Sequence, residues 1–415
     1  MRLGTMARSS RWGKGRPRVS HEWGVGEGAR APSRAGGRLV YGITTGWGAY
    51  SLLRGQLSWM TTRGWDVHLV ADPDARSWAA AEREGVPLVA LPMRRSISMT
   101  SDLRAFVQWL KVLRKLRPEA VNVGTPKAGL LGGMAAAITR VPRRIYVIRG
   151  LRIEGTRGLL CALLWLTECL TIACATDVVV VSASVARRAH ELRLLRRGQS
   201  WLIGDGSSNG VRADGITHRV AEADSSLLRK ELGLTDSDFV VGYVGRVAED
   251  KGIDTLLSAF ALSAPDTKLL LVGPLEDEYL QTVMNGLGSR CVHVGLTDDA
   301  WRYYSVIDLF CLPTRREGFP NVVLEAAAAG IPTVTTRATG AIDSVVDGVT
   351  GFLIDVDDVN ALAGVLTHAS AHRHQLREMG AAARKRCLES FSPERIWRGL
   401  ESILRGQPSA DVRRV

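Results

Sequence analysis

Two glutamates, Glu317 and Glu325, stand eight positions apart in the stretch EGFPNVVLEAAAAG. A Pro-Asn pair follows the first, and the second falls in an alanine-rich run that favours a helix. Eight residues of helix advance about 12 Å and end roughly 80° away from the starting face. The two carboxylates could therefore bind separate parts of an extended ligand. The free N–H groups of the helix N-terminus, which Asn321 can cap, would lie between them and favour phosphate.

A second candidate group lies in the stretch VGRVAEDKGID, residues 244–254. Arg246 and Lys251 follow an apolar run and precede a helical pattern, and two cations at such a junction can neutralise a diphosphate. A glycine turn at Gly245 would let the diphosphate approach the backbone. Either group alone is equally consistent with solvated side chains on loops and helices. Their occurrence in one chain favours a ligand in which a sugar is joined to a nucleoside through a diphosphate.

The elements that must position these groups are short apolar runs, rich in β-branched residues, that alternate with helical patterns. In the first half of the chain, strands are predicted over residues 38–44, 66–71, 87–92, 120–123, 144–148 and 177–182. In the second half, strands are predicted over residues 239–245, 268–273, 291–295, 308–313, 331–336 and 351–355. This alternation predicts an α/β fold with two doubly wound, Rossmann-like domains. Ligands of open parallel sheets bind at the carboxyl ends of the strands, so we expect the site in a cleft between the domains.

Changes in composition and pattern divide the chain into six segments. These are a head (1–37), a first Rossmann-like domain (38–205), a hinge (206–235), a second Rossmann-like domain (236–390), a helix that returns to the first domain (391–405) and a tail (406–415). The hinge is placed where the alternation gives way to a run rich in glycine, serine and aspartate. The length of 415 residues is itself typical of two domains.

The net charge of +12 is unevenly distributed. Residues 1–38 hold nine Lys or Arg against two Glu, a net charge of +7, which leaves only +5 for the other 377 residues. The head is rich in Gly, Arg, Ser and Pro and has no apolar periodicity, so we predict that it is disordered. It could be a basic arm for phosphates or lipid head groups, or an extension without function, which its composition favours. We predict no nucleic-acid partner.

One segment, residues 159–175, is apolar enough to be considered as a membrane span. A span needs about 20 apolar residues, and a mid-span carboxylate such as that of Glu168 costs about 2–3 kcal/mol or more. We therefore predict a core helix between domain layers and no transmembrane segment. The six cysteines fall in apolar runs without a CxxC pair, which predicts reduced thiols in the cytosol.

The aspartate-rich stretches 72–74, 236–238 and 355–358 could suggest a metal site. Each lies in a polar turn beside a predicted strand or helix, where aspartate is an ordinary turn or cap residue. The eight histidines show no ligand spacing. We therefore predict neither a metal nor another cofactor.

In combination, the motifs resemble family 4 of the retaining glycosyltransferases over roughly residues 38–405. Members of that family have the GT-B fold, in which two Rossmann-like domains face each other. The family's E-x7-E motif matches Glu317 and Glu325. The resemblance implies that Glu317 lies against the donor sugar and that Glu325 holds the ribose hydroxyls of the nucleotide. The family's phosphate-binding arginine and lysine match Arg246 and Lys251.

The resemblance also implies roles for the two domains and for further residues. The second domain would bind the nucleotide-sugar donor and the first domain the acceptor. Donor contacts are expected from Gly46, Gly245, Gly318, Phe319, Pro320 and Asn321. Acceptor contacts are expected from Gly48, Lys127 and Arg149. The stretch TTGWGAY matches the family's N-terminal glycine loop, where Gly46 and Gly48 would ease the turn.

Two positions in the first domain depart from the family. Many members have histidine where this chain has Gly124 and Arg149. Arg149 would then hold an acceptor phosphate in place of an imidazole. Lys127, at a predicted helix start, is equally consistent with an anion contact and with a solvated cation.

The first half is most similar to bacterial members that build capsule, exopolysaccharide or lipid-linked oligosaccharides. The resemblance implies transfer of a sugar, such as an N-acetylhexosamine, from a UDP-linked donor to a lipid-linked saccharide. The alternatives are a UDP-sugar 2-epimerase on the same scaffold and a non-catalytic sugar-binding protein. The loss of both histidines argues against the epimerase. The intact set of Arg246, Lys251, Glu317 and Glu325 argues against a non-catalytic protein.

An acceptor of this kind implies a cytoplasmic enzyme at the inner face of the membrane. Cations of the first domain are clustered beside apolar residues in four stretches: 92–98, 111–117, 138–144 and 186–197. Each cation near an anionic lipid surface contributes about 1 kcal/mol. Solvated helix faces explain any single cluster, but their sum predicts peripheral binding to an anionic membrane surface.

Overall fold

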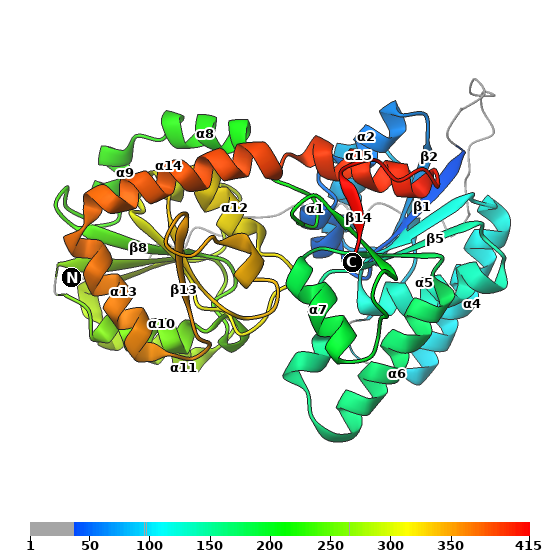
Figure 1. Ribbon diagram of the computed structural model, residues 1–415, viewed down its shortest axis with the longest axis horizontal. Helices are drawn as coiled ribbons and strands as arrows, with labels where there is room; N and C mark the ends of the chain where they lie inside the picture. Colours follow the sequence, from blue (N-terminus) through cyan, green and yellow to red (C-terminus); the bar gives the residue numbers. More distant parts are fainter. Residues whose placement is uncertain (1–36, 95, 97, 265) are drawn as a thin grey trace, which may run out of the picture. The chain divides into compact units, whose positions relative to one another are not determined.

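The computed structural model describes residues 37–94, 96, 98–264 and 266–415 and contains two β-sheets whose strands all run parallel except the last, β14 (Figure 1). The first has the order β14-β7-β6-β5-β4-β1-β2-β3 and the second the order β10-β9-β8-β11-β12-β13. The strands of the first sheet are β1 (Arg38–Gly42), β2 (Asp66–Ala71), β3 (Leu88–Ala90), β4 (Ala120–Val123), β5 (Arg143–Ile148), β6 (Asp177–Val180), β7 (Ser200–Ile203) and β14 (Val412–Arg414). Those of the second are β8 (Phe239–Val244), β9 (Thr267–Val272), β10 (Cys291–Val294), β11 (Leu309–Leu312), β12 (Thr333–Thr336) and β13 (Gly351–Ile354).

Helices cover both faces of each sheet. The α-helices are α1 (Gly46–Leu52), α2 (Gln56–Thr62), α3 (Ala75–Glu84), α4 (Met99–Leu116), α5 (Pro126–Ile138), α6 (Gly158–Cys174), α7 (Ala183–Glu191), α8 (Ala213–Glu222), α9 (Ser225–Glu231), α10 (Ile253–Ala261), α11 (Glu278–Gly286), α12 (Asn321–Ala328), α13 (Val359–Ala371), α14 (Arg373–Ser390) and α15 (Pro393–Leu404). Short 3-10 helices are η1 (Arg152–Gly155), η2 (Glu249–Lys251), η3 (Gly288–Arg290), η4 (Ala300–Val306) and η5 (Ile342–Ser344).

All twelve predicted strands are present, and the α/β fold with two doubly wound sheets is confirmed. The central strand β8 is buried along its whole length, which is why it reads as an unbroken apolar run. On the first sheet, one apolar core lies under α4, α5 and α7, and a second lies under α2, α3 and α15. The second sheet has one large core of its own.

The stretch predicted as a hinge, residues 206–235, is more ordered than its composition indicates. Only its first part is irregular, because α8 and α9 follow. Ile216 of α8 is fully buried, and Asp224 caps α9 by accepting a hydrogen bond from the N–H of Leu227. A buried apolar residue and a capped N-terminus suffice to fold these short helices against the second domain.

The segment predicted as a tail, residues 406–415, contains a strand that the sequence analysis missed. β14 pairs antiparallel with β7, itself unpredicted, and Arg414 lies over the ring of Trp201. Before it, α15 packs against α2 and β7, where Trp397 contacts Trp59. The C-terminal residues thus extend the first sheet at its edge. The predicted head lies outside the described residues except for Gly37.

The apolar segment predicted as a core helix does form a helix, α6, but the prediction that this helix lies in the core is wrong. One side of α6 contacts α5, but most of its apolar side chains are exposed. Within the described ranges, no helix has the length and apolar character needed to cross a bilayer. All six cysteines are free, with Cys311 and Cys387 buried and the others half-buried.

Candidate active site

A cavity of about 550 Å³ lies where the carboxyl ends of the two sheets meet. It is lined from the first sheet by the loops that follow β1, β4 and β5, and from the second by those that follow β8 and β11. The lining residues are Thr44, Thr45, Leu52, Gly124, Thr125, Pro126, Lys127, Tyr146, Val147, Arg149, Gly150, Leu151, Arg152, Arg246, Asp250, Arg316, Glu317 and Gly318. Parallel sheets bind ligands at this edge, because all their loops of one kind gather there.

Glu317 forms an ion pair that links the two predicted motifs of the second domain, the cationic one and the acidic one. Its Oε1 atom lies 2.5 Å from Nζ of Lys251, and both side chains are mostly buried. Lys251 ends the 3-10 helix η2 after β8, whereas Glu317 lies in the loop after β11. The pair therefore joins two neighbouring loops at the floor of the site and fixes both charges.

Arg246 is also held by carboxylates. Its guanidinium contacts Glu276 and lies 3.1 Å from Asp250, so two acidic groups compensate one cation. Its carbonyl oxygen accepts a 2.6 Å hydrogen bond from the Tyr243 hydroxyl, which anchors the loop to β8. Gly245 precedes Arg246, has φ of 151° and lies beside the Tyr243 hydroxyl. A residue with a side chain would be strained at this position. The guanidinium remains half-exposed and faces the cavity.

Arg149 is the cation that the first domain supplies. Its guanidinium donates to Ser208, and its Nε atom is buried without a hydrogen-bond partner among the described residues. Burial lowers the pKa of Arg149 to about 10. A Cβ atom added at Gly124 would lie 2.6 Å from that Nε atom. The two unusual positions therefore fit each other, because the missing side chain at 124 makes room for the arginine.

Gly318 permits a loop of the second domain to touch the first domain, and Gly340 permits close packing within the second domain. A Cβ atom on Gly318 would lie 2.2 Å from the carbonyl oxygen of Arg149. Gly340, with φ of 80°, comes equally close to the backbone of Glu317 and Gly318. Side-chain hydrogen bonds add to this contact, since Thr339 donates to Glu154 at 2.6 Å. Only glycine allows so close an approach of backbone to backbone.

Helix α12 begins one residue earlier than predicted. Pro320 is the residue that precedes the helix, and Asn321 is its first residue, accepting a 3.3 Å hydrogen bond from Ser207 instead of capping. Glu325 is half-buried and accepts a 3.2 Å hydrogen bond from the Tyr304 hydroxyl. Burial raises the pKa of Glu325 to about 7, against hydrogen bonds from Tyr304 and Trp301 that lower it.

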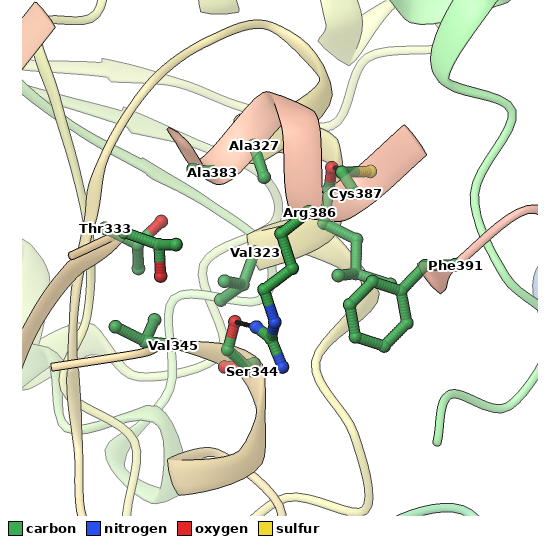
Figure 2. Close-up of a pocket in the computed structure, with 11 residues that line it drawn as sticks. Val323, Ala327, Thr333, Ser344, Val345, Ala383, Arg386, Cys387 and Phe391 are labelled. Atoms are coloured by element: carbon green, nitrogen blue, oxygen red, sulfur yellow. Dashed lines mark hydrogen bonds between the residues drawn. The ribbon is translucent and has the colours of Figure 1, made fainter. Parts of the chain in front are cut away.

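A small cavity beneath α12 does not belong to this site. It holds about 10 Å³, room for roughly one water molecule, and is lined mainly by apolar residues, together with three hydroxyl side chains and Arg386 of α14 (Figure 2). The Arg386 guanidinium points to Ser344 and donates to its carbonyl oxygen at 2.8 Å. This cavity is a packing gap between α12 and α14.

Comparison with known proteins identifies the family to which this chain belongs. Residues 238–371 match the family model described as glycosyl transferases group 1, and residues 45–200 match the glycosyl transferase 4-like domain. The chain is 36% identical to a capsular polysaccharide biosynthesis glycosyltransferase, CapM, of Staphylococcus aureus, over 85% of this chain and 93% of that protein. This protein is a family 4 glycosyltransferase.

Two further relatives extend the comparison. The chain is 26% identical to the UDP-Gal:alpha-D-GlcNAc-diphosphoundecaprenol alpha-1,3-galactosyltransferase of Escherichia coli, over 72% of this chain and 78% of that protein. The structure of Anabaena HepE in complex with UDP-glucose has a TM-score of 0.75 and 19% identity, covering 89% of this chain and 100% of that one. At this identity the likeness shows the fold alone, which is GT-B.

Five predicted site residues of this glycosyltransferase line the cavity: Lys127, Arg149, Arg246, Glu317 and Gly318. Eight others do not: Gly46, Gly48, Gly245, Lys251, Phe319, Pro320, Asn321 and Glu325. Of these eight, Lys251 contacts the site through Glu317, and Gly245 precedes Arg246. Glu325 lies further along the same helix that starts behind the Glu317 loop.

Gly46 and Gly48 do not ease a turn, although this was predicted for the glycine loop of the first domain. Gly46 and Gly48 lie inside α1, and neither has a positive φ. The N–H of Gly46 donates to Asp74 at 3.0 Å, and a Cβ atom there would lie 1.7 Å from the same carboxylate. The N–H of Gly48 donates to Thr45, which caps the helix. Close packing, rather than an eased turn, explains these glycines.

Lys127 is neither free nor solvated. Its Nζ atom lies 2.6 Å from Asp102 of α4 and 2.6 Å from the carbonyl oxygen of Ser96. The lysine therefore ties α5 to α4 at the rim of the cavity. An acceptor group could reach it only by sharing it with Asp102.

Sequence reasoning missed several residues of the cavity wall. Thr44 and Thr125 lie 2.7 Å apart through their hydroxyls, and Thr44 also accepts from the N–H of Ala128 at the start of α5. Arg316 crosses from the second domain to the carbonyl oxygen of Arg152 at 3.5 Å. The available signal was their position, since Thr44 ends a predicted strand and Thr125 and Arg316 lie within three residues after one.

Proposed function

We propose that this glycosyltransferase moves a sugar from a UDP-linked donor to a hydroxyl of a lipid-linked saccharide, with retention of the anomeric configuration. The product would belong to a capsular or other cell-surface polysaccharide. The observation that carries the proposal is the cavity at the edges of both sheets, where Arg149 of one domain faces Arg246 and Glu317 of the other. The names of the two relatives above support capsule synthesis and a diphosphate-linked acceptor.

On the donor side, the second domain offers charges suited to a departing diphosphate. Arg246 and Lys251 would stabilise the negative charge that grows as the bond from the sugar carbon to the diphosphate oxygen breaks. Glu317 would lie against the sugar and shield positive charge at its reacting carbon. The acceptor hydroxyl would form the new bond on the same face, and its proton would pass to an oxygen of the departing diphosphate.

On the acceptor side, the first domain offers Arg149 and the exposed Arg152. Arg149 is held by Ser208, so its guanidinium is fixed before any ligand binds. A fixed, desolvated guanidinium recognises phosphate oxygens strongly. We assign it to the phosphate of the lipid-linked acceptor. The enzyme would work at the inner face of the cell membrane, bound peripherally to anionic lipid.

The test is a panel of nucleotide sugars offered to the purified protein with a diphosphate-linked lipid acceptor in mixed micelles. We expect transfer from one UDP-sugar and an α-linked product from an α-linked donor, read by NMR of the anomeric proton. An inverted product would exclude retention. Conversion of the UDP-sugar without any acceptor would instead support the epimerase alternative.

A further inference from the structure

Helix α6 presents an apolar face with nothing packed on it within the described residues. Leu159 is 91% exposed and Leu166 is 60% exposed. Further exposed apolar side chains on the same helix are Leu160, Leu163, Trp165 and Leu170. Positions 159, 163, 166 and 170 repeat at helical spacing and therefore form one stripe. Soluble surfaces seldom expose contiguous apolar patches, and patches of this kind mark interaction sites.

The single charged residue of α6 is turned away from this face. Glu168 accepts a 2.7 Å hydrogen bond from the hydroxyl of Tyr146, which belongs to β5. Burial raises the pKa of Glu168 to about 6. The inward side of α6 also buries Thr171 and Ile172. The outward side therefore carries no charged side chain, and only the inward side is covered by protein.

Cations stand at the borders of this face. Arg157 directly precedes α6 and is exposed. On another side, the indole N–H of Trp165 donates to the carbonyl oxygen of Leu192 at 2.8 Å, which brings α6 against the exposed residues Arg193, Arg196 and Arg197. None of these four arginines has an ion-pair partner in the part of the chain that the structure describes. An apolar face bordered by unpaired cations complements an anionic lipid surface.

The face lies close along the chain to the residues that line the cavity. Arg149 to Arg152 line the cavity, η1 begins at Arg152, and α6 begins three residues after η1 ends. In Figure 1, α6 lies at the outer border of the first sheet domain, beside α7. A saccharide whose lipid stays in the bilayer would enter the cavity from the side on which α6 meets the membrane.

We propose that α6 is an in-plane membrane anchor whose Leu159–Leu170 face inserts into the interface of an anionic bilayer. The occupant of the face is lipid, not another protein. The inference deepens the proposed function, because it names the surface that would present a lipid-linked acceptor. It rests on the proposed function only for the reason why the enzyme needs an anchor. Vesicle binding needs neither donor nor acceptor, so it can be measured independently of transfer.

The experiment measures flotation of the full chain with vesicles of phosphatidylglycerol and phosphatidylcholine. The test variant carries Leu159→Glu and Leu166→Glu. The matched control carries Leu262→Glu and Leu296→Glu, whose side chains are 63% and 57% exposed in the second domain. We expect the wild type and the control to bind alike and to stay largely bound in about 1 M salt, where charge attraction is screened. The test variant should bind at least about tenfold more weakly.

Three outcomes would overturn the proposal. The first is equal binding by the test variant and the wild type. The second is complete release of the wild type by salt, which would leave charge alone as the cause. The third is a wild-type dimer that the test variant abolishes, without vesicle binding, because the face would then meet a second copy. Transfer to a water-soluble acceptor analogue should persist in the test variant. Absence of transfer in the wild type as well would count against the proposed function but would not contradict the proposal that α6 is a membrane anchor.

Discussion

Nζ of Lys251 lies 2.5 Å from Oε1 of Glu317, so the two loops that meet the donor side of the cavity are joined by one ion pair. The pair neutralises a lysine that, alone, would attract a diphosphate. Glu317→Ala should therefore leave the affinity for the nucleotide diphosphate unchanged or higher, because Lys251 is released. Turnover should fall by about 100-fold or more, because charge at the reacting carbon is no longer shielded. Calorimetry and initial rates separate the two effects.

The complementary change is Lys251→Ala, with Lys385→Ala on the exposed side of α14 as the control. We expect Lys251→Ala to lower turnover about 100-fold with little loss of stability, since the leaving group loses a cation. Unchanged rates in Lys251→Ala would remove the lysine from the mechanism.

Glu325 gives the site a pH dependence. Its pKa of about 7 means that the carboxylate forms only as the pH rises through neutrality. If it accepts hydrogen bonds from ribose hydroxyls, affinity for a UDP-sugar should rise between about pH 6 and pH 8. Glu325→Gln should flatten that rise. The diphosphate of the sugar is esterified at both ends and does not titrate there. A pH profile that is identical in the two proteins would contradict the assignment.

The same raised pKa has an effect on stability. A carboxyl group whose pKa is higher in the folded state binds its proton more tightly there, so ionisation destabilises the fold. The contribution of Glu325 to unfolding free energy should fall as the pH rises from its ordinary pKa of 4.5 to about 7. Relative to Glu325→Gln, the wild type should lose on the order of 3 kcal/mol across this range. Urea unfolding at pH 5 and at pH 8, on the two sides of the raised pKa, measures the change in unfolding free energy.

Gly124→Ala tests the fit between Gly124 and Arg149. The new methyl group would lie 2.6 Å from Nε of Arg149, and the guanidinium is the part that can move. We expect a fold of near-normal stability, a raised KM for the lipid-linked acceptor and about tenfold lower kcat/KM. Gly133→Ala is the matched control, because its methyl group would come no closer than 3.9 Å to Cys174. Normal acceptor kinetics in Gly124→Ala would refute the role of Arg149.

Asn209 holds the junction between α2, α15 and the loop before α8. It is buried, accepts a 2.7 Å hydrogen bond from Trp397 and donates a 2.9 Å bond to the carbonyl oxygen of Arg54. Asn209→Ala leaves both partners unsatisfied and should lower the unfolding free energy by about 2–4 kcal/mol. Asn360→Ala, on the exposed side of α13, should change it by less than about 0.5 kcal/mol. Thermal and urea denaturation compare the two.

Transfer should not depend on a divalent metal, because Arg246 and Lys251 would carry the charge stabilisation. We expect unchanged initial rates after EDTA treatment and no stimulation by Mg²⁺ or Mn²⁺. Strict dependence on either ion would contradict the cationic mechanism.

The sequence by itself determined twelve strands of the two sheets and five residues of the cavity wall. Parallel strands buried on both faces read as unbroken apolar runs, so all twelve predicted strands exist. Loops that follow such strands gather at one edge, which is why Arg246 and Glu317 could be placed at one site, whereas Arg149 was placed there by the family resemblance. These features depend on residues close together in the chain.

Only the tertiary structure decided which of these groups are free. Lys127 forms an ion pair with Asp102, and the N–H of Gly46 donates a hydrogen bond to Asp74. In each case the two partners belong to different parts of the chain. The same holds for β14, whose three residues become a strand because β7 offers an open edge. It holds most clearly for α6, since an apolar helix has the same sequence whether its outer face meets a core or a membrane. Burial and pairing depend on partners distant in the chain, and no local pattern specifies them.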